Sequence, residues 1–232
     1  MEIKLFTADV AALKDPLLFR ALYTSVSAPR REKIDRIQAQ KGRLLSLGAG
    51  ALLEAALAEL GIRSPRLILK ANGKPYLADR NDVFFNLSHS GTKVLCALSD
   101  HEIGCDVEQR RSAKLPLARR CFCAEEYQAI LNERDSAARD RLFYRFWTLK
   151  ESFLKVTGLG LQLPLNAFQI RIAEDRITVE QSVDTRHYAF CSFSTDDYEY
   201  ALCSADRIPE GVKLTLRSFP SLLDVLSGSK LP

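Results

Sequence analysis

The sequence is poor in the residues that build zinc sites and disulfide frameworks. It contains six cysteines and three histidines, and no two cysteines form a C-x-x-C pair. Zinc ligands come at short, regular spacings, and disulfide frameworks need many cysteines in a short chain. The sequence therefore predicts free thiols in a reducing compartment rather than a zinc site or a set of disulfide bonds.

Long apolar runs and a strong excess of one charge are also missing. No stretch approaches the roughly 18 apolar residues of a membrane-spanning helix. The opening residues MEIKLFTADV lack the basic region and apolar run of a signal peptide. The net charge of +4 is far below that of a dedicated nucleic-acid binder. We therefore expect a cytoplasmic monomer that binds neither membranes nor nucleic acid.

What is present is the composition of a globular protein. The 232 residues are 47% hydrophobic and 27% charged, which suffices for one large domain or two small ones. Helical patterns come first and a run of strands follows, and this order occurs twice along the chain. It predicts an α+β fold of two similar α/β subdomains, each with an antiparallel sheet packed on helices, over residues 1–111 and 112–232.

Local patterns place the individual elements of these two halves. Pro16 and Pro29 break an early helical region, Asn72-Gly73 marks a turn between short strands, and residues 112–120 look like a linker. Helical periodicity covers 44–57, 124–131 and 137–158, and Gly158 is placed to end the last of these helices. Strand patterns cover 4–10, 83–91, 92–99, 102–108, 166–172, 177–182, 188–194 and 198–205.

The stretch EIGCDVEQ, residues 102–109, predicts a strand with two unlike faces. The odd-numbered residues from 103 to 107 are apolar, whereas Asp106 and Glu108 share the other face with Gly104. Two such carboxylates repel each other and raise each other's pKa. Solvent could neutralise this face, as it does on many half-buried sheets, or one hard cation such as magnesium could bind there. The stretch alone leaves both interpretations open.

The helix that covers 137–158 also has two faces. Trp147, Glu151 and Lys155 are spaced four residues apart and therefore lie on one side. A glutamate four residues before a lysine is also a common solvent-exposed pair, so this spacing alone does not establish a site. The apolar residues at three- and four-residue steps predict a buried side, formed by Leu142, Phe146, Leu149, Phe153 and Val156.

Three motifs follow one another in the order of a known family. FFNLSHSG, IGCDVEQ and FWTLKESFLKVTGLGLQLPL fit the patterns N-[IL]-S-H-S, G-x-D-[IV]-E and W-x-x-K-E-[AS]-x-x-K. The sequence resembles the 4′-phosphopantetheinyl transferases, especially the type that activates surfactin synthetase. This resemblance extends from PRREK near residue 29, through NGKPYL, to about residue 172. Cys105 stands where the family pattern usually has an aliphatic residue.

The resemblance implies a reaction and a fold. Members of the family transfer the 4′-phosphopantetheine arm of coenzyme A to a serine of an apo acyl or peptidyl carrier protein, and adenosine 3′,5′-bisphosphate is released. The carrier domains belong to fatty-acid, polyketide or nonribosomal-peptide synthases. The fold is two α/β halves related by a pseudo-twofold axis, with coenzyme A in the cleft between them. The cofactor is Mg²⁺, with Mn²⁺ as the alternative.

The resemblance also implies roles for individual residues of this chain. The residues that match the metal ligands are Asp106, Glu108 and Glu151. Glu151 is also a candidate base for the incoming serine, and Lys155 reaches the diphosphate; Lys150 belongs to the motif with a weaker claim to the site. The residues that match the coenzyme A site are Arg30 and Lys33 at the 3′-phosphate, with Arg43 or Ser46 helping, Lys74 and Pro75 at the adenine, and Ser88 and His89 at the phosphates. Glu126 matches a glutamate near the carrier-binding edge.

Two other functions use the same residues. A magnesium-dependent phosphohydrolase would use the three carboxylates to cleave another diphosphate and release a free phosphoester into water. A non-catalytic module would keep the fold and bind carrier proteins without turnover. The presence of Asp106, Glu108, Glu151 and Lys155 argues against the second alternative.

Overall fold

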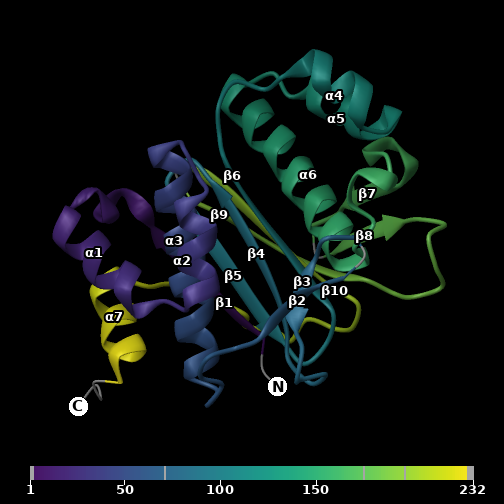
Figure 1. The fold of residues 1–232 in the computed structure, drawn as a ribbon. Helices are drawn as coiled ribbons and strands as arrows, with labels where there is room; N and C mark the ends of the chain where they lie inside the picture. The colour runs from purple at the N-terminus through teal and green to yellow at the C-terminus, as the bar shows by residue number, and fades with distance from the viewer. Residues whose placement is uncertain (1–2, 71, 175, 196, 229–232) are drawn as a thin grey trace.

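The computed structural model shows a layered α+β molecule in which helices cover the outer faces of two sheets (Figure 1). The structure describes residues 3–70, 72–174, 176–195 and 197–228. Within these ranges no helix has both the length and the apolar character needed to cross a membrane. The α+β fold with antiparallel sheets on helices, expected from the sequence, is therefore confirmed, whereas the pseudo-twofold relation stays a prediction.

The N-terminal part of the chain forms the first helical layer and a four-stranded sheet. Its sheet order is β11-β1-β5-β4, and all pairs except β1–β11 are antiparallel. The apolar side of the long helix α3 packs on this sheet and forms one core. The elements are β1 (Lys4–Asp9), η1 (Val10–Lys14), α1 (Pro16–Ser25), α2 (Ala28–Asp35), α3 (Gln40–Ala58), β2 (Leu67–Leu69), β3 (Pro75–Leu77), β4 (Phe84–Ser90) and β5 (Lys93–Ser99).

The rest of the chain forms a three-stranded antiparallel sheet, β6-β10-β9, and the second helical layer. Helix α6 packs on this sheet and on α4 and α5. The elements are β6 (Ile103–Gln109), α4 (Leu115–Cys121), α5 (Ala124–Asn132), α6 (Ser136–Thr157), η2 (Gly160–Gln162), η3 (Leu165–Ala167), β7 (Gln169–Ile172), β8 (Ile177–Glu180), β9 (Ala189–Ser194), β10 (Tyr198–Ser204), β11 (Leu214–Leu216) and α7 (Phe219–Ser227).

The two sheets share a core and meet at the edge where β4 faces β6. Their inner faces bury a common cluster that includes Leu95, Val107 and Tyr200. At the edge, side chains of β4 replace a backbone ladder by accepting hydrogen bonds from amides of β6. These bonds join Asn86 Oδ1 to Cys105 N (2.9 Å), Ser88 Oγ to Val107 N (3.4 Å) and Ser90 Oγ to Gln109 N (3.1 Å). Because alternate residues of a strand share a face, one face of β4 supplies all three bonds.

The two parts of the chain are interwoven. Strand β11 pairs in parallel with β1, and α7 packs against α1 and α3 in the core of the first part. Neither element was expected from the sequence. The boundary between residues 111 and 112 stays a prediction, and any such division has to assign β11 and α7 to the first half in space.

One local expectation was wrong and two are confirmed. Pro16 and Pro29 divide the early helical region as expected, because each lies in the first turn of a new helix, α1 or α2, where a missing amide hydrogen costs nothing. The supposed linker at 112–120 contains most of α4, because Leu115 and Leu117 pack on the core beneath α6 and Ala118 is fully buried there. By contrast, Gly158 ends α6 in the left-handed conformation, with φ of 74°, as expected.

Candidate functional site

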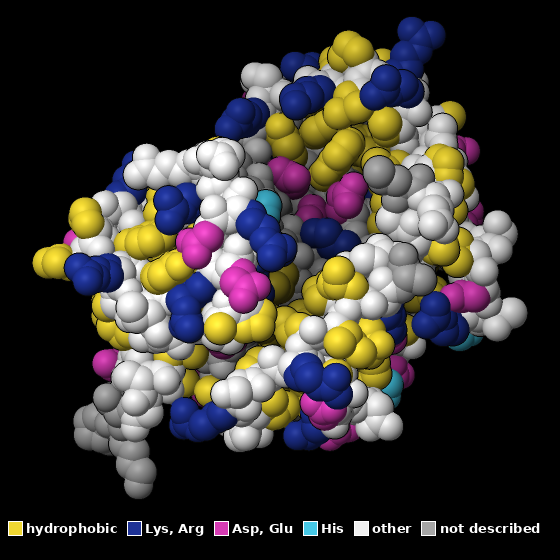
Figure 2. Space-filling view, in the orientation of Figure 1, with side chains coloured by type: hydrophobic (Ala, Val, Ile, Leu, Met, Phe, Trp, Pro, Cys, Tyr) yellow, Lys and Arg dark blue, Asp and Glu magenta, His cyan; other side chains and the backbone are white. Residues whose placement is uncertain are grey.

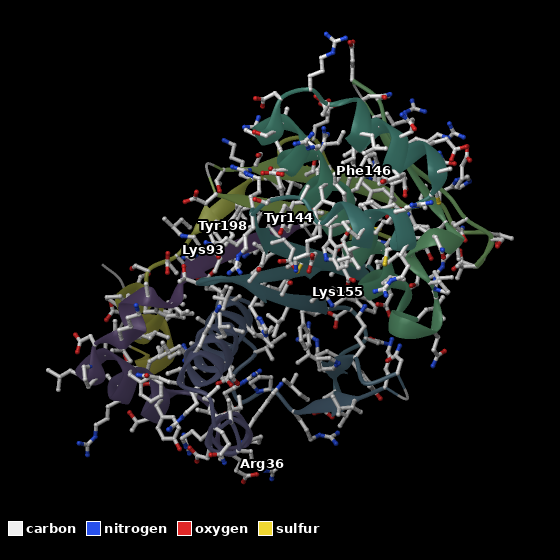
Figure 3. The ribbon with its side chains drawn as sticks, turned by 90° about the horizontal axis from the view of Figure 1, so that it is seen from above. Arg36, Lys93, Tyr144, Phe146, Lys155 and Tyr198 are labelled. Carbon is white, nitrogen blue, oxygen red and sulfur yellow. The ribbon has the colours of Figure 1, made fainter. Side chains whose placement is uncertain are left out.

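Helix α6 and strand β6 bring the predicted acidic and basic residues together. Lys155 Nζ lies 2.6 Å from Asp106 Oδ1, 2.9 Å from Ser88 Oγ and 3.1 Å from the carbonyl oxygen of Cys105. Figure 3 shows Lys155 on α6 where this helix meets the strands. The ammonium group of Lys155 is therefore fixed between β4 and β6, and Asp106 is the carboxylate that holds it.

Gly104 permits this close approach of helix and strand. A β-carbon at this position would lie 2.5 Å from the amide nitrogen of Val156 and even closer to the carbonyl oxygen of Ser152, both in the backbone of α6. Only a glycine fits between β6 and α6 here. The glycine in the G-x-D-x-E pattern thus sets the distance between the acids of β6 and the side chains of α6, a role that sequence reasoning missed.

Two serines of β4 hold the acids of β6. Ser88 Oγ donates to Asp106 Oδ1 at 2.7 Å, and Ser90 Oγ donates to Glu108 Oε2 at 2.6 Å. Hydroxyl bonds to carboxylates are strong and directional. The N-L-S-H-S motif therefore orients both carboxylates, and Ser88 also accepts from Lys155; its place at a phosphate stays a prediction.

The electrostatics of the acidic cluster leave a surplus of negative charge. Burial, then repulsion by Asp106, raises the pKa of Glu151, and Lys155 only partly offsets this. Burial also raises the pKa of Glu108, and Asp106 adds to the effect. Although burial alone would lower it, attraction by Asp106 raises the pKa of Lys155. The cluster thus contains one cationic side chain, Lys155, and three carboxyl groups.

The donor chemistry of this cluster fits a hard divalent cation. Asp106 Oδ2 is buried and has no hydrogen-bond partner, so one carboxylate oxygen is left for a ligand that supplies positive charge. Oxygen-only donors and a surplus of negative charge suit magnesium. In the described residues, however, no three acidic, histidine or cysteine side chains are already grouped as a finished metal site. The cluster supplies part of a coordination shell and leaves the remainder to water or substrate oxygens.

A cavity of about 540 Å³ has basic residues in its wall, and Arg30, Lys33 and Pro75 line it. Phe85 and Leu87 of β4 also line it, so the strand that carries Ser88 and Ser90 borders this cavity as well. Figure 2 shows this face of the molecule hollowed, with both basic and acidic side chains on the walls. The structure thus brings the predicted 3′-phosphate pair and Pro75 to one cavity.

The other predicted coenzyme A residues do not line this cavity. Lys74 is tied down, because its Nζ donates to Glu102 at 3.0 Å and to the carbonyl oxygen of Ile103 at 3.2 Å. His89 is exposed near the end of β4 rather than in a loop, and partial burial lowers its pKa, with Lys155 and Lys33 contributing. Arg43 and Ser46 are not among the residues that line the cavity.

Lys150 and Glu126 belong to the core and not to the site. Lys150 Nζ and Glu126 Oε1 form a buried ion pair at 2.8 Å, with side chains 0% and 1% exposed. Lys150 also donates to the carbonyl oxygens of Leu165 and Phe168, and Glu126 accepts from the amide of Ile170. A buried carboxylate of this kind cannot touch a carrier protein, so Glu126 has a structural role, and its place near a carrier-binding edge stays a prediction.

A second, smaller cavity of about 190 Å³ adjoins the acidic cluster at Glu108 and Ser90. Its wall carries the basic residues Arg111 and Lys114 and the aromatic ring of Trp147, which stacks on Phe143 at 6.0 Å. Sequence reasoning missed this cavity. The only signal was Trp147, a large ring one turn before Glu151 on the same side of α6.

Comparisons with known proteins agree with the motifs. The model of the 4′-phosphopantetheinyl transferase superfamily matches residues 102–203. 4′-Phosphopantetheinyl transferase ffp of Bacillus subtilis is 34% identical over 211 residues, which are 87% of this chain and 92% of that protein. 4′-Phosphopantetheinyl transferase Sfp of Bacillus subtilis (strain 168) is 31% identical over 204 residues, 85% of this chain and 90% of that protein.

Solved structures show a more partial likeness. A holo-(acyl-carrier-protein) synthase from Bacillus anthracis str. Ames, in complex with CoA (3′,5′-ADP), aligns with a TM-score of 0.38 at 13% identity, over 44% of this chain and 92% of that chain. The sequence relatives match over nearly their whole length. By these matches, the chain belongs to the 4′-phosphopantetheinyl transferase superfamily.

Proposed function

We propose that this protein transfers the 4′-phosphopantetheine arm of coenzyme A to a serine of an apo acyl or peptidyl carrier protein. The observation that carries this function is the cluster of Asp106, Glu108, Glu151 and Lys155, together with two cavities of different character that strand β4 also lines. The larger cavity has the basic walls and the size for the nucleotide end of coenzyme A. The smaller one, at Glu108, offers the side from which a carrier serine would approach.

The reaction exchanges one phosphorus–oxygen bond for another. The serine oxygen of the carrier bonds to the β-phosphorus of coenzyme A, and the bond from that phosphorus to the bridging oxygen breaks. Adenosine 3′,5′-bisphosphate leaves with the electron pair. The serine proton passes to Glu151, directly or through a water molecule, because Glu151 is the carboxylate that α6 brings to the acids of β6.

The other residues of the cluster hold and neutralise the reacting groups. Asp106, Glu108 and Glu151 would hold Mg²⁺, or Mn²⁺ in its place. When bound, such an ion neutralises charge that develops on the diphosphate oxygens. Lys155 adds a positive charge next to the same oxygens, and Asp106 and Ser88 fix its position. Arg30 and Lys33 attract the 3′-phosphate in the larger cavity.

The experiment that tests this function incubates the protein with coenzyme A, MgCl₂ and purified apo-carrier proteins. We expect each accepted carrier to gain the mass of one phosphopantetheine arm, with one adenosine 3′,5′-bisphosphate released per arm. Carriers from fatty-acid, polyketide and nonribosomal-peptide synthases, tested side by side, identify the partner. The cytoplasmic location and the monomeric state stay predictions.

The same incubation separates transfer from its alternatives. A phosphohydrolase would release adenosine 3′,5′-bisphosphate from coenzyme A without any carrier present, and that result would contradict the proposal. A non-catalytic carrier-binding module would bind the carriers and leave their masses unchanged.

A further inference from the structure

One buried carboxylate of α3 lies outside the acidic cluster. Glu54 is 8% exposed and stands between Leu53 and Ala55, which are fully buried. A buried carboxylate is costly unless it is hydrogen-bonded or paired. Both of its oxygens bind one residue, because Oε2 accepts from the amide of Ser27 and Oε1 from the hydroxyl of Ser27, each at 2.8 Å. Both hydrogen bonds of the Glu54 carboxylate thus go to Ser27, the residue that precedes α2.

Ser27 is the N-cap position of α2, and its hydroxyl makes no capping bond within that helix. The hydroxyl donates to Glu54 instead. A carboxylate from α3 therefore stands at the positive end of the α2 dipole, where negative charge is stabilising. Since α2 carries Arg30 and Lys33, Glu54 fixes the beginning of the helix that supplies the cations of the larger cavity.

Gly50 lies one turn before Glu54 on the same face of α3. A β-carbon at Gly50 would lie 2.5 Å from Cδ and 2.8 Å from Cγ of Arg30, closer than atoms that are not bonded can approach. The side chain of Arg30 therefore runs directly over the α3 backbone at this glycine. Burial lowers the pKa of the Arg30 guanidinium and attraction by Glu54 opposes that effect, so the two groups interact electrostatically.

We propose that Gly50 and Glu54 form a socket that positions Arg30 for the 3′-phosphate of coenzyme A. Gly50 sets the path of the Arg30 side chain, and Glu54 holds the start of α2. Arg30, Lys33 and Glu54 all line the 540 Å³ cavity, so the socket forms part of its wall. The inference rests on the proposed function, because the 3′-phosphate is the group that coenzyme A has and dephospho-coenzyme A lacks.

The negative charge of Glu54 and its positioning of Arg30 have opposite effects on the affinity for the phosphate. Glu54 is an anion on the wall of a cavity that receives a phosphate, and Coulomb repulsion alone would make Glu54→Gln bind the phosphate more tightly. Positioning predicts weaker binding, because a glutamine has one acceptor oxygen and cannot accept both bonds from Ser27 in the same geometry. The sign of the change therefore separates the two effects.

The test is calorimetric titration of the whole, metal-free protein with coenzyme A and with dephospho-coenzyme A. We expect the wild type to prefer coenzyme A, and Gly50→Ala and Glu54→Gln each to reduce this preference about tenfold. Affinity for dephospho-coenzyme A should change little in either variant. In an Arg30→Ala background neither substitution should reduce the preference further, because both act through Arg30.

Gly42→Ala is the matched control. It also replaces a glycine of α3 by a better helix former, but its β-carbon meets a methyl group of Ile37 instead of Arg30. This control should keep the wild-type preference. Thermal unfolding of Gly50→Ala checks that the fold is retained, and alanine itself favours the helix at that position.

Three results would overturn the socket. They are an unchanged or increased preference for coenzyme A in both variants, a loss of preference that persists in the Arg30→Ala background, and a wild-type protein that transfers the arm but does not distinguish the two ligands. A failure of the proposed function looks different. It would show as absent transfer to every carrier while the preference for coenzyme A, and its loss in both variants, remain.

Discussion

The two carboxylate oxygens of Asp106 have different hydrogen-bond environments. Oδ1 accepts from Ser88 and from Lys155, whereas Oδ2 is buried without a partner. An unsatisfied buried acceptor costs about 1–3 kcal/mol. The pKa values of Glu108 and Glu151 are raised as well. The unpartnered oxygen and these two raised pKa values indicate that the folded protein holds carboxylates whose negative charge a bound cation would offset.

Magnesium should therefore stabilise the wild-type fold, because a ligand that binds only the folded state raises Tm. Glu151→Gln should lose most of this rise. It should also melt above the wild type in metal-free buffer: the raised pKa of Glu151 means that its ionised form is disfavoured in the folded protein, and glutamine removes that cost. Thermal unfolding against MgCl₂ concentration measures both effects.

Asp82→Asn is the control for this measurement, since it alters only an exposed pair with Arg80. Its response to MgCl₂ should equal that of the wild type. A Glu151→Gln variant with the full wild-type response would remove Glu151 from the proposed ligand set.

At the scale of elements, the contact between α6 and β6 determines the site. Gly104 lets the backbone of α6 approach β6, and the side chains on that side of α6 meet the acids of β6. Because Gly104 allows this close approach, the acids of the β6 motif and the lysine of the α6 motif lie next to each other.

Gly104→Ala should separate the two elements. A methyl group there would collide with the backbone of α6, which cannot move as a side chain can, so we expect a loss of about 1–3 kcal/mol in the free energy of unfolding. Transfer should fall more steeply than stability, because Lys155 moves away from Asp106. Urea unfolding and carrier mass spectrometry measure the two effects, and Gly42→Ala serves as a glycine control. Normal transfer by a stable Gly104→Ala protein would disprove this role.

The β2–β3 hairpin is fixed by a second contact, at Glu102. This carboxylate pairs with Lys70 at 2.7 Å and with Lys74 at 3.0 Å. Although burial acts to raise it, the hydrogen bonds and charges of the two lysines lower the pKa of Glu102. A carboxyl group with a lowered folded-state pKa stabilises the fold above its unfolded pKa, and this contribution is lost as pH falls through the folded value.

Glu102→Gln should accordingly destabilise the protein at pH 7, by about 1 kcal/mol or less for a pair with one partly exposed lysine. The difference from the wild type should shrink below about pH 4, where glutamates become protonated. Unfolding free energies measured from pH 7 to pH 3 test this. A difference that stays constant over that range would show that Glu102 acts through its shape and not through its charge.

At the scale of the whole molecule, β4 runs between the two cavities. Phe85 and Leu87 line the larger one, and Ser90 lines the smaller one beside Arg111 and Lys114. The two sheets meet along this strand through its side chains. Nucleotide and carrier serine would therefore approach the acidic cluster from opposite ends of one strand.

Docking of the carrier should depend on the basic residues of the smaller cavity, which would attract acidic side chains of the carrier. We expect the apparent KM for an apo-carrier to rise with salt, because electrostatic steering is screened. Arg111→Glu with Lys114→Glu should raise KM at low salt and flatten its dependence on salt, with a smaller change in kcat. A KM that is flat from low salt to several hundred millimolar in the wild type would indicate an apolar docking contact.

Much of this architecture could be predicted from local pattern. The two-faced strand at 102–109 and the buried side of α6 follow from spacing, and Ile103, Val107, Leu149 and Phe153 are fully buried as expected. Strand β11 could not be predicted, because it is three residues long and pairs with β1 from the other end of the chain. The site residues were proposed through motifs, and helical spacing already gave Lys150 a weaker claim than Glu151. Spacing could not predict that Lys150 is buried in an ion pair with Glu126.

The acidic cluster should transfer the phosphopantetheine arm and not merely bind ligands. Intact-mass spectrometry of one apo-carrier over time, with wild type and Asp106→Asn at equal concentration, tests it most directly. We expect the wild type to convert the carrier fully and a carrier whose target serine is alanine not at all. Asp106→Asn should be slower by about 100-fold or more, as when a preorganised charge is removed. Conversion by Asp106→Asn at the wild-type rate in millimolar MgCl₂ would contradict the account.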